Sequence, residues 1–202
     1  MRIAMVVSQF PALSETFILA QITGLLDLGH DVQIFPLYRR PEPKMHPAVE
    51  EYGLLERTHQ PPSWHEWPET LAALTSLGRV MLHHPLQGMR LLLRAPRKHG
   101  LPHRGALIHC EPLLLAHERD PFDIVHAQFG TMGYSTMALP RVCDTKFVVN
   151  FRGGGDTTMW ARRKGAGAYD ELWETGDLFM TVCDVLKEKS IEMGAPCEKV
   201  MT

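Results

Sequence analysis

One segment combines an arginine, a glycine run and an aspartate, a combination that can bind an anion or a sugar. Arg152-Gly153-Gly154-Gly155-Asp156 follows the apolar run 146–151. Successive glycines expose backbone N–H groups that can hold an anion, and an arginine can grip a phosphate or carboxylate through two hydrogen bonds. The aspartate can accept hydrogen bonds from sugar hydroxyls. Glycine-rich turns are common after strands, so the place of this segment in the fold decides its weight.

A histidine and its neighbours form the second candidate. His126 ends the run 122–126 and leads into Ala127-Gln128-Phe129-Gly130. A histidine can donate a hydrogen bond to a substrate hydroxyl or act as a general base. The alternative is that His126 satisfies backbone groups at the end of a strand. Gln128 and Phe129 are candidate substrate-binding residues beside it.

The loop after the first apolar run, 3–7, offers a hydroxyl, an amide and an aromatic ring. Its residues are Ser8, Gln9 and Phe10, followed by Pro11. A dinucleotide-binding loop at this place would carry closely spaced glycines, and this one has none. An NAD-dependent oxidoreductase is therefore disfavoured. The loop is either part of a binding site or an ordinary connection between a strand and a helix.

Cys183 and Asp184 follow another apolar run, 177–182. A thiolate can act as a nucleophile, but no histidine is near Cys183 in the sequence, so a small buried residue is the expectation. Asp184 is expected to be the N-cap of the next helix. The four cysteines are dispersed and predict reduced thiols. No set of residues has metal-ligand spacing, so we expect no metal site.

An alternation of strands and helices positions these segments. A helix is expected between Ser14, as its N-cap, and Gly29, with apolar residues on one face. A helix of this length is a crossover, so the strands on either side must be parallel. Further strands are expected at 122–126, 146–151, 177–182 and from Val200, and helices at 134–139, 169–175 and 185–193.

This alternation predicts an α/β fold with a doubly wound, mostly parallel Rossmann-like sheet. In such a sheet, ligands bind at the carboxyl ends of the strands. The four candidate segments all follow strands, so they should converge on one edge. The same criterion excludes every histidine except His126.

The chain is expected to form one domain, 1–202, with an irregular and helical insertion at about 38–118. Six prolines lie between Pro36 and Pro62 and indicate a long irregular excursion from the sheet. Helical spacing of apolar residues follows, and prolines predict breaks between short helices. These prolines are Pro85, Pro96, Pro102 and Pro112.

The charge of the chain is near neutral overall but locally biased. A net charge of -2 argues against a nucleic-acid partner, which would require a strongly basic face. The segment 79–104 is basic and leucine-rich, which would suit an anionic membrane surface. The alternative is a solvated basic face. No run approaches the length of a membrane-spanning helix, so a cytoplasmic protein is expected, with peripheral contact at the inner face of the membrane as an option.

Several segments in order resemble the N-terminal half of family-4 (group 1) glycosyltransferases of GT-B fold, particularly enzymes of exopolysaccharide and colanic-acid-type assembly. The resemblance covers nearly the whole chain. The segments are Arg2–Pro11 with Ser14–Ile18, Leu28–Val32, Ile124–Gly130, Phe151–Gly153 with Asp156, Asp177–Cys183, Lys187–Lys189, Met193–Pro196 and Glu198–Val200.

The resemblance implies metal-independent transfer of a sugar, with retention of the anomeric configuration, from a nucleotide-sugar to a polysaccharide or lipid-linked acceptor. It implies no tightly bound cofactor. Ser8 to Phe10 would help hold the acceptor, and Arg152 would contact the transferring sugar. His126 would orient a hydroxyl, and Asp156 would position the Arg152 loop.

The resemblance also implies a C-terminal donor domain that this chain does not contain, so the chain alone should be inactive. A different class remains open. The chain could be a stand-alone Rossmann-like module whose strand-end loops bind a partner or a small ligand without catalysis.

Overall fold

A computed structural model describes residues 1–202 except 41–43, 99–100, 154 and 160–166. Its centre is a six-stranded sheet in the order β2-β1-β5-β6-β7-β8, and every neighbouring pair is parallel. The predicted α/β fold with a doubly wound parallel sheet is confirmed. The strands are β1 (Arg2–Val7), β2 (Asp31–Pro36), β5 (Ile124–Ala127), β6 (Lys146–Phe151), β7 (Leu178–Thr181) and β8 (Val200–Met201).

The first strand, helix, strand unit forms as its pattern predicts, apart from the start of the helix. Helix α1 spans Thr16–Asp27, and Gly29 after it has a φ of 78°. Only a residue without Cβ adopts this φ without strain, so Gly29 ends the helix. The prediction of Ser14 as the N-cap is wrong, because Glu15 holds that position. The Glu15 side chain does not cap α1 and instead accepts a hydrogen bond from Ser8.

Apolar cores lie on both faces of the sheet. One contains Met5 and Val7 of β1 and packs against α1, and the other contains Ala4 and Val6 of the same strand. Successive strand residues point to opposite faces, so the continuous apolar run of β1 fills both cores. Helices therefore cover the sheet on both faces.

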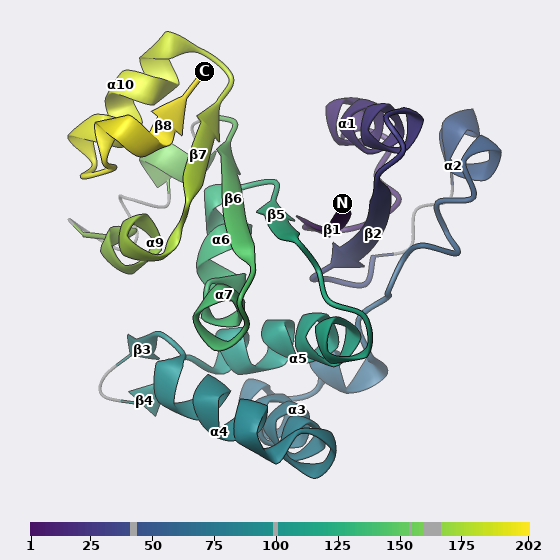
Figure 1. Cartoon of the computed structure of the whole chain (residues 1–202), viewed down its shortest axis with the longest axis vertical. Coiled ribbons are helices and arrows are strands. Elements are labelled where there is room, and N and C mark those ends of the chain that lie inside the picture. The colour runs from purple at the N-terminus through teal and green to yellow at the C-terminus, as the bar shows by residue number, and fades with distance from the viewer. Residues whose placement is uncertain (41–43, 99–100, 154, 160–166) are drawn as a thin grey trace.

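Helices also make up most of the described part of the predicted insertion, and the longer ones, within residues 69–119, lie along the bottom of Figure 1. Pro85 and Pro96 lie at helix boundaries as predicted, but the break at Pro112 is wrong. Helix α5 runs through it, since burial of Leu113, Leu114 and others outweighs the roughly 3 kcal/mol that an interior proline costs. The elements are α2 (Pro47–Glu51), η1 (Ser63–Glu66), α3 (Glu69–His83), α4 (Pro85–Arg94), β3 (Arg97–Lys98), β4 (Leu101–Pro102) and α5 (Arg104–Arg119).

The second half of the chain returns to strand and helix alternation. Gly194 follows the last helix with a φ of 99°, as the sequence predicts for a helix end. The predicted helix at 134–139 is two short helices, of which the first begins at Gly130 and the second at Ala138. The elements are α6 (Gly130–Thr136), α7 (Ala138–Val142), one π-helical turn η2 (Gly155–Met159), α9 (Asp170–Thr175), α10 (Asp184–Glu192) and η3 (Cys197–Lys199).

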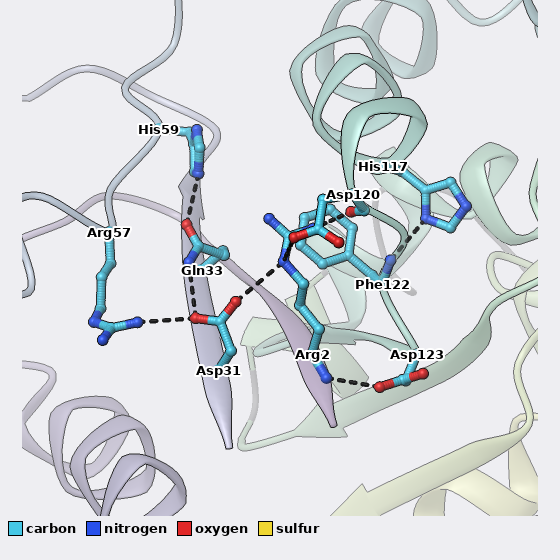
Figure 2. A network of polar contacts seen from close by, with 9 residues as sticks. All are labelled: Arg2, Asp31, Gln33, Arg57, His59, His117, Asp120, Phe122 and Asp123. Atoms are coloured by element: carbon cyan, nitrogen blue, oxygen red, sulfur yellow. Dashed lines mark hydrogen bonds and ion pairs between the residues drawn. The ribbon is translucent and has the colours of Figure 1, made fainter. Parts of the chain in front are cut away.

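A network of charges lies where the strands of the sheet begin, which we call its N-terminal edge (Figure 2). Arg2, at the start of β1, lies 3.1 Å from Asp31 and 3.0 Å from Asp120, with its guanidinium over the ring of Phe122. Arg57 lies 2.9 Å from the same Asp31. These pairs join β1, β2 and the end of α5 at the edge opposite the strand-end loops.

Candidate functional site

A pocket of about 650 Å³ lies at the C-terminal edge of the sheet. We call it the strand-end pocket. The loops after β5, β6 and β7 supply its walls, together with α1. Its lining residues are Phe17, Phe129, Thr131, Arg152, Gly153, Gly155, Asp156 and Val182.

Arg152 is held at this pocket by two amide side chains. One terminal nitrogen of its guanidinium donates to Gln128 Oε1 at 2.7 Å and to Gln21 Oε1 at 3.0 Å. The guanidinium also lies over the Phe17 ring, 4.5 Å from its centroid. Its buried Nε has no hydrogen-bond partner among the residues that the structure describes. Arg152 is therefore fixed in place without using all of its donors.

The electrostatics around Arg152 are balanced by two carboxylates. Burial lowers the pKa of Arg152, whereas the charges of Asp156 and Glu15 raise it. Burial raises the pKa of Glu15, and the hydrogen bond from Ser8 and the charge of Arg152 oppose that effect. An arginine stays protonated under such shifts, so the pocket keeps a fixed positive charge.

A buried chain of hydrogen bonds supports Arg152 on the side that faces away from the pocket. Gln128 Oε1 also accepts from Asn150 Nδ2 at 3.4 Å, and Asn150 Oδ1 lies 3.0 Å from His126 Nε2. These donor and acceptor roles make His126 the neutral tautomer that carries its proton on Nε2. Burial lowers the pKa of His126, which agrees with a neutral ring. His126 is thus linked to Arg152 by three successive hydrogen bonds, through Asn150 and Gln128.

Asp156 ties the Arg152 loop to α6. One carboxylate oxygen accepts from the backbone N–H of Arg152 at 3.3 Å, and the other accepts from that of Thr131 at 3.4 Å. Asp156 is 3% exposed. Burial raises the pKa of Asp156 to about 6, although the backbone hydrogen bonds oppose this shift. The carboxylate is therefore ionised at neutral pH but close to protonation.

The structure brings only part of the predicted site to the strand-end pocket. Phe129, Arg152, Gly153, Gly155 and Asp156 line it. His126 and Gln128, which were also predicted, lie behind Arg152 in the buried chain of hydrogen bonds instead. Gly154 lies outside the described residues.

The predicted acceptor loop does not line the strand-end pocket. Ser8 donates to Glu15 Oε1 at 3.3 Å, and Phe10 is 6% exposed in the core under α1. Gln9 is half-buried between them. The loop supports the base of α1, which in turn presents Phe17 to the pocket.

The expectation that Cys183 is a small buried residue is wrong. Strand β7 ends at Thr181, so Val182 and Cys183 extend beyond the sheet and are exposed. Cys183 is also the N-cap of α10, and Asp184 is the first helical residue rather than the cap. The Asp184 carboxylate accepts from Thr202 Oγ1 at 3.0 Å. The exposed thiol lies one residue after Val182 of the pocket wall.

Thr131 and Val182 of the pocket lining, and also three residues around Arg152, were missed from the sequence. Phe17 and Gln21 lie one turn apart on α1 and both meet Arg152. Asn150 interrupts the apolar run of β6, and its side chain joins His126 to Gln128. A polar residue inside a buried strand needs a partner, and this was the available signal. Nothing in the α1 sequence singled out Gln21.

The described part of the chain has neither a metal-binding cluster nor a membrane-spanning helix. No group of three or more His, Cys, Asp or Glu side chains there is placed to hold a metal ion. No helix within those residues is long and apolar enough to cross a membrane.

The parallel sheet, the helices on both of its faces and the strand-end pocket define a Rossmann-like α/β domain. The solved structure of the lipopolysaccharide outer core galactosyltransferase WaaB in its apo form aligns with all of this chain and 45% of its own, with a TM-score of 0.53 and 14% identity. That likeness concerns the fold alone. The chain belongs to the glycosyl transferase 4-like domain family, whose sequence model matches residues 14–202.

Curated relatives match almost the whole chain at low identity. The amylovoran biosynthesis glycosyltransferase AmsK of Erwinia amylovora is 27% identical over 99% of this chain. WcaL of Salmonella typhimurium, which its name assigns to colanic acid biosynthesis as a glycosyltransferase, is also 27% identical over 99%. The match covers 49% of each relative, so the chain spans about half the length of the curated relatives it matches. The resemblance seen in the sequence is confirmed.

Proposed function

We propose that this chain is the acceptor-side half of a retaining glycosyltransferase that moves a sugar from a nucleotide-sugar to a polysaccharide or lipid-linked acceptor. The observation that carries the proposal is the fixed positive charge of Arg152 at the strand-end pocket, held between Gln21 and Gln128. The family and the names of the relatives support the reaction class.

The charge of Arg152 matches what the reaction requires. Transfer breaks the bond between the anomeric carbon and the diphosphate, which leaves with negative charge, and forms a bond to an acceptor oxygen that loses its proton. A fixed guanidinium and nearby backbone N–H groups stabilise charge that develops in the transition state. Arg152 and the Gly153 and Gly155 backbone are at the pocket to do this.

The buried residues behind Arg152 position it. Asp156 holds the loop through two backbone N–H groups, and the chain from His126 through Asn150 fixes Gln128. His126 acts here through Arg152 instead of by orienting a hydroxyl directly, because it is buried and does not line the pocket.

We assign the nucleotide-sugar to a second Rossmann-like domain in the other half of the protein, facing the strand-end pocket. The transfer would need no resident metal or cofactor, since Arg152 supplies the positive charge on this side. Addition of a chelator to the complete enzyme should leave the rate unchanged. A loss that Mg²⁺ or Mn²⁺ restores would contradict this part of the proposal.

The direct test is an assay of the complete enzyme and of this chain alone against a panel of nucleotide-sugars, with cell-derived lipid-linked oligosaccharides as acceptors. The complete enzyme should form a product whose anomeric configuration, read by NMR, equals that of the donor. The chain alone should form none. Transfer by the chain alone, or an inverted product, would refute the proposal, and ligand binding with no transfer by the complete enzyme would favour the stand-alone binding module.

We also propose that the basic part of the insertion rests on the inner face of an anionic membrane. One face of α4 exposes Leu86, Met89 and Leu93, which are 72%, 55% and 61% exposed at helical spacing. Arg90 and Arg94 are exposed on the same helix. An apolar stripe beside arginines suits the boundary between lipid headgroups and acyl chains.

Liposome co-sedimentation of this chain tests the membrane contact. Anionic vesicles should bind it more tightly than neutral ones, and Leu86→Gln should reduce binding. Leu28→Gln is the matched control, because Leu28 is 74% exposed after α1. Equal binding to neutral and anionic vesicles would remove the membrane role.

A further inference from the structure

A second pocket, of about 350 Å³, lies between the insertion and α6. We call it the insertion pocket. It collects residues from the end of β2, from η1 and α5, and from α6. Its principal lining residues are Tyr38, His65, Trp67, His103, His109 and Thr131. Thr131 lines the strand-end pocket as well, so the two pockets adjoin on α6.

The insertion pocket combines aromatic rings with hydrogen-bonding groups. Tyr38 and Trp67 both line the pocket and are 45% and 48% exposed, so the protein does not cover them fully. The Tyr38 ring meets His109 edge to face at 5.5 Å, and the rings of His109 and His65 are 6.2 Å apart. The backbone N–H of Tyr38 donates to the carbonyl of Ser8 at 2.9 Å. Tyr38 is thereby anchored to the first strand-end loop.

Two buried histidine nitrogens at this pocket have no hydrogen-bond partner among the described residues. His65 is fixed by a bond from its Nε2 to the buried carboxylate of Glu111 at 3.3 Å, and its side chain is 6% exposed. Within the described residues, neither His65 Nδ1 nor His109 Nδ1 has a hydrogen-bond partner. Buried polar atoms without partners are uncommon, and each calls for an explanation, of which a group bound at the site is one.

The charges around the insertion pocket do not suit an anion. Arg79 is 2.8 Å from Glu111, so its charge is compensated there. Burial lowers the pKa of His109 to about 3, so its ring is neutral at physiological pH. Of the lining residues in the described part of the chain, leaving histidines aside, Glu69 alone has a formal charge, and that charge is negative. A phosphate would therefore be repelled rather than held.

We propose that the insertion pocket binds a neutral sugar ring of the acceptor, beyond the unit whose hydroxyl receives the new sugar. A sugar ring offers an apolar C–H face to aromatic rings and hydroxyls to histidine, tyrosine and carboxylate groups, and this pocket presents both. Its volume lies at the lower end of the about 300–1,000 Å³ of ligand pockets. The inference rests on the proposed function. Thr131 lines both pockets, so one acceptor oligosaccharide would place its reacting sugar in the strand-end pocket and its next sugar in the insertion pocket.

The test uses histidine side-chain NMR of this chain, titrated with the methyl glycosides of glucose, galactose, mannose and fucose and, separately, with inorganic phosphate. At least one glycoside should shift the His65 and His109 signals in a saturable manner, whereas phosphate should not. If phosphate alone shifts them, or if no glycoside does, the proposal is overturned.

Matched tyrosine variants locate the binding. Tyr38→Ala should weaken binding of the glycoside by about tenfold, since it removes a stacking ring. Tyr38→Phe should keep most of it. Tyr52→Ala is the control, because Tyr52 lies at the end of α2 and its hydroxyl binds Asp27. Equal weakening by Tyr38→Ala and Tyr52→Ala would refute this location.

An assay of the complete enzyme separates this inference from the proposed function. Glycoside binding at His109 without any transfer by the complete enzyme would leave the sugar site standing and refute the transferase. Transfer by the complete enzyme with no glycoside binding at His109 would refute the sugar site alone. If both hold, Tyr38→Ala should raise KM for an oligosaccharide acceptor and leave kcat unchanged.

Discussion

The two edges of the sheet each hold an arginine beside carboxylates, but they hold it in different ways. At the N-terminal edge, Arg2 is paired directly with Asp31 and Asp120 (Figure 2). At the C-terminal edge, Arg152 is bound by the neutral amide oxygens of Gln21 and Gln128 and faces a pocket. A charge neutralised by direct ion pairs fastens strands together. A charge held by amides remains available to a ligand.

The carboxylates at the two edges also differ, because the pKa of Asp31 is lowered and that of Asp156 is raised. Burial works against ionisation of Asp31, but hydrogen bonds from Gln33 and Arg2, with the charges of Arg2 and Arg57, lower its pKa overall. Burial dominates at Asp156 and raises its pKa to about 6. One edge stabilises its negative charge, whereas the other tolerates it beside the pocket.

The largest expected effect is that of Arg152→Ala on turnover. Its loss removes the fixed charge at the strand-end pocket, so kcat of the complete enzyme should fall about 100-fold or more. KM for the acceptor should change less, because the charge acts mainly in the transition state. Steady-state kinetics measure both. An unchanged kcat would show that Arg152 is as structural as Arg2.

The second prediction concerns the pH dependence of folding. The pKa of Asp156 is raised to about 6 in the folded protein, so folding is favoured when this group is protonated. Its contribution to the free energy of unfolding is fully present below about pH 4 and is lost as the pH rises through 6. The loss is about 3 kcal/mol at most. Asp31 has a lowered pKa, so its contribution is present above about pH 4 and is lost as pH falls through the lowered value. Urea denaturation across pH should therefore show that Asp156→Asn and Asp31→Asn remove opposite slopes. Slopes of the same sign would break the contrast between the edges.

The third prediction is that Arg2→Ala destabilises the fold without touching chemistry. The Arg2 side chain is 18% exposed and contacts two carboxylates and the Phe122 ring, so about 2 kcal/mol of unfolding free energy should be lost. Lys146→Ala is the control, since its pair with Asp177 is exposed and should contribute little. A large fall in kcat of the folded Arg2→Ala enzyme would mean that the N-terminal edge also serves the reaction.

The smallest expected effect is that of Asn150→Ala. Loss of this amide unlinks His126 from Gln128, and the looser Arg152 should lower kcat about tenfold with little change in acceptor KM. Gln33→Ala at the opposite edge is the matched control, because Gln33 links Asp31 to His59. Equal effects of the two substitutions on kcat would show that the buried chain does not position Arg152.

The sequence was sufficient for the architecture because strand and helix periods are local properties. The run 146–151 formed β6 at its predicted bounds, and the crossover argument gave parallel pairing. The failures were also local. Glu15 and not Ser14 is the N-cap of α1, and Pro112 lies inside α5. In both places, tertiary contacts outweighed the preference of the residue type for a helix end.

The candidate site was only partly predictable, because the local pattern of residues does not show how deeply a side chain is buried. The criterion of strand ends found Arg152 and Asp156 at the pocket but could not tell that Phe10 turns into the core. The same criterion excluded His65 and His109, which lie 44 positions apart within the insertion and meet only when η1 packs against α5. Partners that come from distant parts of the chain require the fold before they can be named.

The most direct test of the contrast between the edges is NMR of the two arginine Nε–H groups in the complete enzyme during transfer. The Nε of Arg152 has no hydrogen-bond partner among the described residues, whereas that of Arg2 lies between Asp31 and Asp120. Addition of nucleotide-sugar and acceptor, under conditions that form product, should shift the Arg152 signal and leave the Arg2 signal in place. Product formation with an unmoved Arg152 signal would contradict the account.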